Sequence, residues 1–173
     1  MQLADALPAD AVLVEEALTT SAPLPAHLRQ RDRQGYYGLA SGGIGFAVAG
    51  AVGISIALPQ RPVVALIGDG SAMYSIQALW TAVRLKRPIT YVIANNRGYR
   101  ILKERLVSFR NTDKFLGMDI RDPEIDFVRL AQSMGMPARR ITEPQDILPA
   151  LQAAIASGAP NLLDVAVADG FGG

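Results

Sequence analysis

Short runs of β-branched and apolar residues alternate along the chain with longer segments in which apolar residues recur at helical spacing. The runs predict strands at residues 11–14, 63–67, 89–94 and 162–168, with a further short strand at 138–141 compatible with the pattern. The longer segments predict helices at 44–58, 75–86, 98–107, 125–134 and 144–156. Such alternation predicts an α/β fold, a parallel sheet with helices on both faces joined by right-handed crossovers. We expect one domain over residues 1–173, frayed at 1–10 and 169–173.

Composition excludes several classes of function. The 17 Lys and Arg residues nearly balance the 16 Asp and Glu residues. The sequence has no stripe of basic residues, so it gives no indication of a nucleic-acid partner. The apolar run at 44–58 is shorter than the roughly 20 residues that a membrane helix needs, so it predicts a buried helix and no membrane span. The chain has no cysteine, which excludes disulfides and thiolate metal sites. Together with the lack of a basic-then-apolar leader, this favours a cytoplasmic protein.

Polar residues follow two of the predicted strands. Asp69 lies between two glycines directly after the strand at 63–67, and Asn95 and Asn96 follow the strand at 89–94. Ligands of open parallel sheets bind at the carboxyl ends of the strands, where neighbouring strands are about 4.8 Å apart. One carboxylate, one amide oxygen and a main-chain carbonyl near Gly98 form an all-oxygen set that suits Mg²⁺ or Ca²⁺. A magnesium ion with so few protein ligands retains positions for phosphate oxygens.

Two glycine-rich segments favour an anionic ligand. Gly68 and Gly70 permit tight turns and a close approach of main-chain N–H groups to an anion, and Ser71 adds a hydroxyl donor. We expect the helix beginning near residue 75 to point its N-terminus at the same place. The segment "SGGIGF" at 41–46 is a second loop of this kind. Two such loops predict an extended ligand, such as a diphosphate.

The motifs "GGIGFAVAGAVG", "GDGSAMYSIQALWTA" and "NNRGY" resemble those of thiamine diphosphate-dependent enzymes. They are most similar to the C-terminal cofactor domain, the PP-type domain, of benzoylformate decarboxylase and its relatives, and the likeness spans residues 12–167. The resemblance implies a thiamine diphosphate-binding fold and cofactor chemistry, in which a thiazolium ylid adds to a 2-oxo acid and carbon dioxide leaves.

The resemblance also implies roles for individual residues. The magnesium ligands would be Asp69, Asn96 and the Gly98 carbonyl. Residues near the cofactor would be Thr19, Gly70, Ser71 and Tyr99 at the diphosphate, with Gly42, Gly43, Ile44 and Met73 at the pyrimidine and the bend between the two rings. The substrate pocket would include Leu18, Leu102 and Arg105.

Two departures from the family pattern matter. Leu18 and Arg105 stand where the benzoylformate enzyme has hydroxyl and aromatic residues, which argues against an aryl substrate and suggests that Arg105 meets a substrate carboxylate. In the family, a glutamate that activates the cofactor comes from a separate pyrimidine-binding domain across a subunit interface. We therefore expect the chain to need a pyrimidine-binding domain or subunit for turnover, to be inactive alone, and to form a homo-oligomer.

Several alternatives remain open. An acetolactate-synthase-like carboligase shares these motifs, and a non-catalytic scaffold subunit could retain the fold. Asp69 could instead occupy an ordinary turn, and Ser71 could cap a helix. The remaining prominent side chains have plainer interpretations: Tyr36, Tyr37 and Trp80 as packing residues, His27 as a surface or capping residue, and Glu15 and Glu16 as a solvated strand end.

Overall fold

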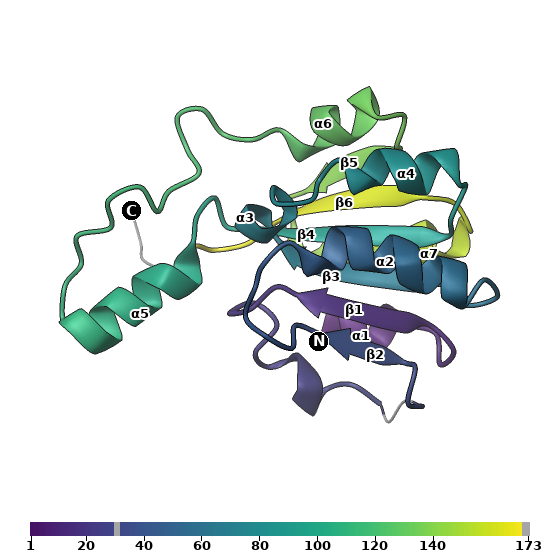
Figure 1. Ribbon diagram of the computed structural model, residues 1–173, viewed down its shortest axis with the longest axis horizontal. Helices are drawn as coiled ribbons and strands as arrows, with labels where there is room; N and C mark the ends of the chain where they lie inside the picture. Colours follow the sequence, from purple (N-terminus) through teal and green to yellow (C-terminus); the bar gives the residue numbers. More distant parts are fainter. Residues whose placement is uncertain (30–31, 171–173) are drawn as a thin grey trace.

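The computed structural model describes residues 1–29 and 32–170 and forms one parallel six-stranded sheet within them (Figure 1). The strands lie in the order β2-β1-β3-β4-β6-β5, and every pair is parallel. Their bounds are β1 Val12–Glu16, β2 Tyr36–Gly38, β3 Val63–Gly68, β4 Ile89–Asn95, β5 Ala138–Ile141 and β6 Asn161–Ala166. The predicted α/β class and all five predicted strand regions are confirmed.

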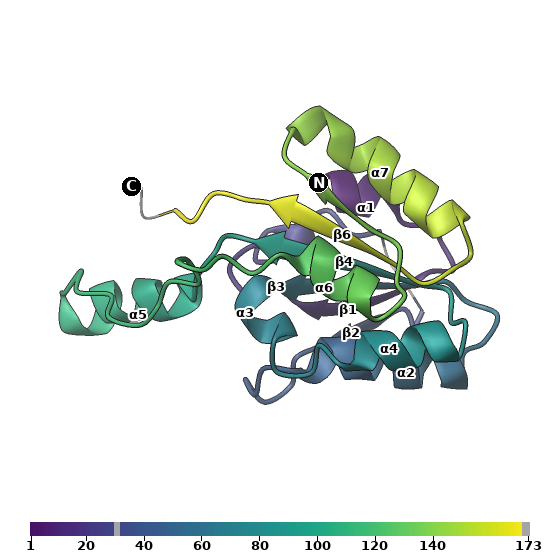
Figure 2. The same cartoon turned by 90° about the horizontal axis from the view of Figure 1, so that it is seen from above.

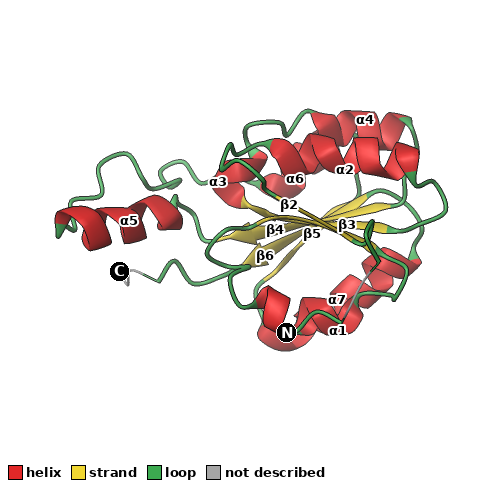
Figure 3. Cartoon of the chain, turned by 60° about the horizontal axis from the view of Figure 1, so that its bottom comes forward, coloured by secondary structure: helices red, strands yellow, loops and turns green. Residues whose placement is uncertain are grey.

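Helices cover both faces of the sheet, which explains why the central strands read as nearly continuous apolar runs. Helices α2, α4 and α6 lie on one face, and α1 and α7 lie on the other (Figures 2 and 3). The helical bounds are α1 Gln2–Ala6, α2 Phe46–Ala57, α3 Asp69–Ala72, α4 Ala78–Arg84, α5 Arg100–Arg110, α6 Phe127–Ser133 and α7 Pro144–Ala156, with a 3₁₀ turn at Leu24–Ala26. No helix among the described residues has the length and apolar character to span a bilayer.

Alternate residues of each central strand belong to two separate cores, because successive side chains point to opposite faces. In β3, Val63, Ala65 and Ile67 pack with α2 and α4, whereas Val64 and Leu66 pack with α1 and α7. Phe127 of α6 completes the first core, and all these residues are buried.

The N-terminus contradicts the expectation that residues 1–10 fray. They include helix α1, whose Leu3 and Ala6 are buried in the second core. The Gln2 side chain donates to the Pro144 carbonyl at 3.0 Å and accepts from the Leu148 amide at 2.9 Å, which ties α1 to α7. At the other end, Asp169 forms an ion pair with Arg121, and residues 171–173 lie outside the described part of the chain.

Helix α2 is buried on one face only, which corrects the prediction of a buried helix. Ile56 is 55% exposed and Phe46 is 36% exposed on its outer face. Trp80 on the adjacent α4 was expected in the core but is 53% exposed, with the Arg84 guanidinium 5.5 Å from its ring centroid. Tyr36 is also exposed at its strand, while Tyr37 packs against the first core as predicted.

Both glutamates at the end of β1 accept hydrogen bonds from the protein, contrary to the expectation of a solvated strand end. Glu16 is completely buried and accepts hydrogen bonds from the backbone amides of Gly45 and Ala47, at the start of α2. Helix N-termini carry unpaired N–H groups and partial positive charge, so the start of α2 stabilises this carboxylate in its buried position. The Ser75 hydroxyl donates to the Gly45 carbonyl at 2.7 Å. The loop before α2 is therefore fixed to β1 and to the segment after β3.

Glu15 organises the turn that follows β1. Its carboxylate accepts from the Ala17 amide at 2.8 Å and from the Ser21 hydroxyl. Ser21 also donates to the Leu18 carbonyl at 3.0 Å. Leu18 has a φ of 50°, which is rare for a bulky non-glycine residue, so this network holds a strained backbone in place.

Asp164 on β6 supports the end of β4 from inside the sheet. Its Oδ1 accepts from the Asn95 side-chain amide at 3.0 Å, whereas the buried Oδ2 has no hydrogen-bond partner. The nearest cation to Oδ2 is Arg140 Nε, at 3.9 Å. Burial raises the pKa of Asp164, and the Asn95 hydrogen bond and the Arg140 charge oppose that shift.

Alanine substitution should have opposite effects on stability at Gly45 and at Gly53. At Gly45, φ is +101° and a Cβ would lie 2.7 Å from Cβ of Tyr74, so Gly45→Ala should lower the free energy of unfolding by about 2 kcal/mol or more. Gly53 lies within α2 with nothing within 4 Å of a Cβ, so Gly53→Ala should raise it by about 0.5–1 kcal/mol. Urea unfolding measures both variants, and equal effects would contradict this account of the loop.

Asp164→Asn should change how stability depends on pH. Because the folded protein holds this proton to higher pH than the unfolded chain, the ionised carboxylate costs stability as pH rises through the raised pKa. As the pH rises above 3.8, the usual pKa of an aspartate, the variant should therefore lose less stability than the wild type. Urea unfolding across a pH series measures this, with the exposed Asp113→Asn as control. Parallel pH profiles for Asp164→Asn and the wild type would refute the expectation.

Candidate functional site

A pocket of about 600 Å³ opens at the carboxyl ends of the strands. The chain leaves β1 toward β2 and leaves β3 toward β4, so the point where the direction reverses lies between β1 and β3, where open α/β sheets bind ligands. Four segments supply most of the lining, namely residues 17–20, 68–71, 98–102 and 116–118. Gly42, Ile44, Tyr74, Ala94 and Asn96 supply the rest.

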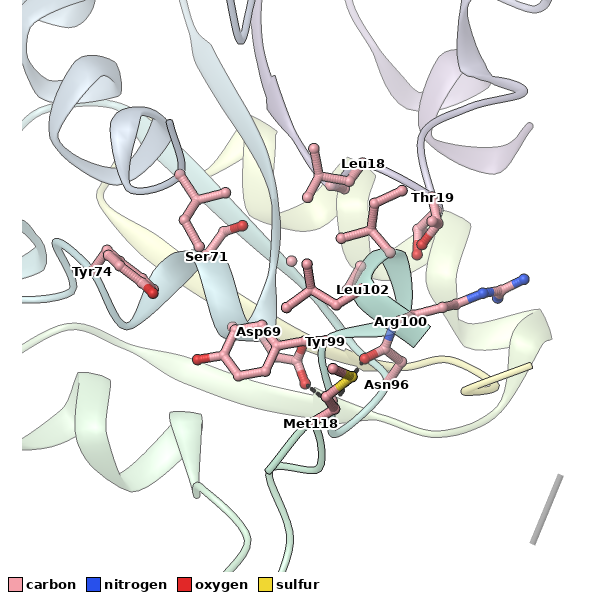
Figure 4. Close-up of a pocket in the computed structure, with 18 of the residues that line it drawn as sticks. Leu18, Thr19, Asp69, Ser71, Tyr74, Asn96, Tyr99, Arg100, Leu102 and Met118 are labelled. Atoms are coloured by element: carbon pink, nitrogen blue, oxygen red, sulfur yellow. Dashed lines mark hydrogen bonds between the residues drawn. The ribbon is translucent and has the colours of Figure 1, made fainter. Parts of the chain in front are cut away.

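Asp69 and Asn96 converge on one backbone amide. The Gly98 N–H donates to Asp69 Oδ2 at 3.1 Å and to Asn96 Oδ1 at 3.0 Å, so the two oxygens lie on the same side of the turn. Both side chains are buried, with exposed fractions of 2% and 6%. Figure 4 shows them side by side at one end of the pocket. Residues from neighbouring strand ends therefore meet, as the sequence predicts.

The electrostatics of Asp69 suit a cation. Burial raises its pKa, while hydrogen bonds from backbone amides, Gly70 first, partly offset this, and no ion pair of Asp69 occurs within the described residues. The described residues contain no group of three or more His, Asp or Glu side chains placed to bind a metal. A carboxylate, an amide oxygen and a main-chain oxygen remain, and such a hard, sparsely charged set fits Mg²⁺ with phosphate oxygens as further ligands.

The loop after α5 holds the turn at residues 97–99. The Tyr99 amide donates to the Met118 carbonyl at 2.8 Å, and the Ile120 amide donates to the Arg97 carbonyl at 2.9 Å. Lys103, which is 4% exposed, pairs with Asp119 at 2.7 Å and draws the loop to α5. The polar segment 108–123 thus supplies part of the pocket wall, through Leu116, Gly117 and Met118.

The expected phosphate-facing residues line the pocket. Thr19, Gly70, Ser71 and Tyr99 are all among its walls, and a Cβ at Gly70 would lie only 2.5 Å from Cε1 of Tyr99, so the tyrosine ring packs directly on the glycine. The helix that begins here is the short α3, starting at Asp69, and α4 begins only at Ala78. The prediction that a helix from about residue 75 points its N-terminus at the site is therefore wrong.

The second glycine loop contributes two of its three predicted residues. Gly42 and Ile44 line the pocket, whereas Gly43 does not. Met73, expected in the pyrimidine pocket, is 39% exposed and also lies outside the lining. Tyr74, which the sequence reasoning did not single out, lines the pocket in its place, opposite Leu18 and Thr19 in Figure 4.

The predicted substrate residues are brought together only in part. Leu18 and Leu102 line the pocket, but Arg105 does not, and its guanidinium lies 5.7 Å from the ring centroid of Phe109. The arginine in the pocket is Arg100, which sequence reasoning missed. Its position directly after Tyr99 was the available signal, because the first residue of a helix that begins at the site must lie near it.

Comparisons with known proteins agree with this geometry. Residues 20–165 match the family described as the thiamine pyrophosphate enzyme C-terminal TPP binding domain. Benzoylformate decarboxylase of Pseudomonas aeruginosa is 34% identical over 93% of this chain and 30% of its own length. IlvX of Mycobacterium tuberculosis, whose name places it with acetolactate synthase large subunits, is 40% identical over 93% of this chain and 32% of its own length.

A solved structure shows the same fold. The 4-hydroxybenzoylformate decarboxylase of Rhodococcus jostii RHA1 superposes with a TM-score of 0.89 and 37% identity, covering 96% of this chain and 31% of that protein. The chain thus spans about a third of the length of the relatives that it matches. Its six parallel strands, its pocket at the strand ends and these matches show that it belongs to the thiamine pyrophosphate enzymes, as a C-terminal cofactor-binding domain.

Proposed function

We propose that this chain binds thiamine diphosphate through Mg²⁺ and acts with a pyrimidine-binding domain or subunit in the decarboxylation of a 2-oxo acid. The observation that carries the proposal is the convergence of the Asp69 and Asn96 oxygens on the Gly98 amide at 3.1 and 3.0 Å. The named function of the Pseudomonas and Rhodococcus relatives supports the decarboxylase class.

Different residues of the pocket would bind different parts of the cofactor. Asp69, Asn96 and the Gly98 carbonyl would hold the metal, and the Ser71 and Thr19 hydroxyls would donate to phosphate oxygens. On the far side, the Gly42 carbonyl and the Ile44 side chain would meet the aminopyrimidine and the bend between the rings. When bound, thiamine diphosphate supplies the electron sink that decarboxylation needs.

The pocket itself supplies little acid–base chemistry. Its titratable lining residues are Asp69, Tyr74, Tyr99 and Arg100, and Asp69 is committed to the metal in this proposal. No glutamate, histidine or lysine lines it among the described residues. The acid that activates the cofactor would therefore come from outside this chain, which supports the requirement for a partner domain and the expected inactivity of the chain alone.

An exposed apolar face supports the partner proposal. The outer sides of α2 and α4 and the segment between α3 and α4 expose large apolar side chains, namely Phe46, Ile56, Met73, Tyr74, Trp80 and Leu85. Helices that are apolar nearly all round are normally covered, and exposed apolar patches mark interaction surfaces. We propose that this face associates with other subunits, so that the chain forms a homo-oligomer.

Carboligation is the second candidate reaction. The 40% identity to a protein named for acetolactate synthases favours it specifically. Both reactions use the same cofactor site, so the residue roles given above do not change. Analysis of the products formed from a 2-oxo acid by the assembled enzyme, aldehyde or coupled hydroxyketone, decides between the two.

Substitution of the metal ligands tests the cofactor proposal. Asp69→Asn and Asn96→Ala should each weaken Mg²⁺-dependent binding of thiamine diphosphate by at least the 10- to 100-fold that loss of an outer-sphere partner costs. Calorimetry on the chain, with and without its pyrimidine-binding partner, measures this. Asp113→Asn, an exposed aspartate on the loop after α5, is the matched control. Binding by the wild type that does not depend on Mg²⁺ or on Asp69 would refute the proposal, and negligible binding throughout would favour the scaffold alternative.

Charged substitutions on the exposed apolar face of α2 and α4 test the proposed homo-oligomer. Light scattering at high concentration should show a dimer or larger species for the wild type and a monomer for Ile56→Lys combined with Trp80→Lys. The reason is that burying two unpaired charges in an interface costs several kcal/mol. Gln152→Lys, on the exposed side of α7 across the sheet, should leave the mass unchanged. A monomeric wild type would overturn the proposed association.

A further inference from the structure

Arg100 has a hydrogen-bonding capacity that the protein does not use. It is the first residue of α5 and lines the pocket. Its Nε donates to Glu104 Oε1 at 2.9 Å, and the described residues provide no hydrogen-bond acceptor for its two terminal nitrogens. The side chain is 33% exposed, so the guanidinium is partly withdrawn from water. A planar group with free parallel N–H donors matches a carboxylate or a phosphate.

The position of Arg100 is unfavourable for the helix that carries it. The first turn of a helix carries partial positive charge, so a cation there is repelled. The i,i+4 pair with Glu104 offsets this only in part, because the favourable order places the acid before the base. A cation in the first turn of a helix is unfavourable for stability, and its presence at a pocket wall suggests a role in binding. A bound anion would be stabilised by both the guanidinium and the helix N-terminus.

Arg100 lies at the edge of the pocket. In Figure 4 its guanidinium extends outward past Thr19, whereas Ser71 and Tyr74 lie on the opposite side of the pocket. Arg100 is the only cationic residue that lines the pocket among the described residues, and Asp69 is the only anionic one. Any oxyanion that enters the pocket beyond the reach of the metal therefore has one charged partner.

We propose that Arg100 binds an oxyanion of a ligand in this pocket, either the terminal phosphate of the cofactor or the carboxylate of the 2-oxo acid. The assignment rests on the proposed function of the same site. It replaces the sequence-based suggestion that Arg105 meets a substrate carboxylate. Arg105 is five positions further along α5, stacked on Phe109 and outside the pocket, and so provides a matched control on the same helix.

Calorimetry on the full chain tests the assignment with two probes. Inorganic pyrophosphate with Mg²⁺ represents the cofactor phosphates, and pyruvate, titrated into the chain saturated with Mg²⁺–pyrophosphate, represents the substrate carboxylate. Arg100→Gln should weaken one of these probes about tenfold, the loss of one charge-assisted hydrogen bond. Arg100→Lys should recover part of that loss, and Arg105→Gln should match the wild type. The probe that weakens identifies the source of the oxyanion.

Glu104→Gln should have the opposite effect on the affinity for the probe. Removing the carboxylate that occupies Arg100 Nε should strengthen binding of the same probe about threefold, because the guanidinium charge is no longer partly neutralised. Thermal unfolding of each variant establishes that it is folded. A variant that weakens binding only by unfolding would also lose binding of Mg²⁺ alone.

The assignment to Arg100 falls if Arg100→Gln and Arg105→Gln bind pyrophosphate and pyruvate equally well. If the wild type binds no pyruvate, the pyrophosphate arm alone decides. Failure of the proposed function gives a different result, in which the wild type binds no Mg²⁺–pyrophosphate or binds it independently of Asp69. The two failures are therefore distinguishable in one set of titrations.

Discussion

Parallel pairing of β3 with β4 is the constraint on which the rest of the structure depends. The register places Gly68 opposite Ala94, so the chain leaves both strands at the same level and Asp69 and Asn96 emerge side by side. The pairing is secured by the burial of almost every residue of the two strands between helices on both faces. A slip of one residue would move each side chain to the other core and separate the two oxygens. The same packing that folds the sheet thus sets the geometry of the site.

The features that the sequence could predict are those that local patterns determine. The β-branched runs located the strands, and the glycines and polar residues after β3 and β4 located the pocket, because chain order alone brings them to one edge. Helix α1 and strand β2 were missed because each is too short for a periodic signal. Their stability depends on contacts made elsewhere, with α7 and with β1.

The errors concern residues whose surroundings are set by distant parts of the chain. Glu16 resembles a surface residue in the sequence, yet it accepts from amides of the loop that begins α2. Trp80 has the size of a core residue, yet it lies exposed on the outer side of α4. Arg100 and Arg105 lie on one helix, and only the direction in which α5 leaves the sheet determines which of them faces the pocket. None of these placements follows from helical or strand periodicity.

Helix α5 projects from the body of the molecule and packs extensively against no other described helix or strand (Figures 1 and 2). Its first residue follows Tyr99 directly, and Lys103 links it to the loop that clamps the turn at Gly98. The helix is therefore joined directly to the turn at Gly98, which carries one of the proposed metal ligands. If that turn binds a cation as proposed, a protein that bound α5 and displaced it would alter the cation affinity, and by thermodynamic reciprocity the cation would alter the affinity for that protein to the same degree.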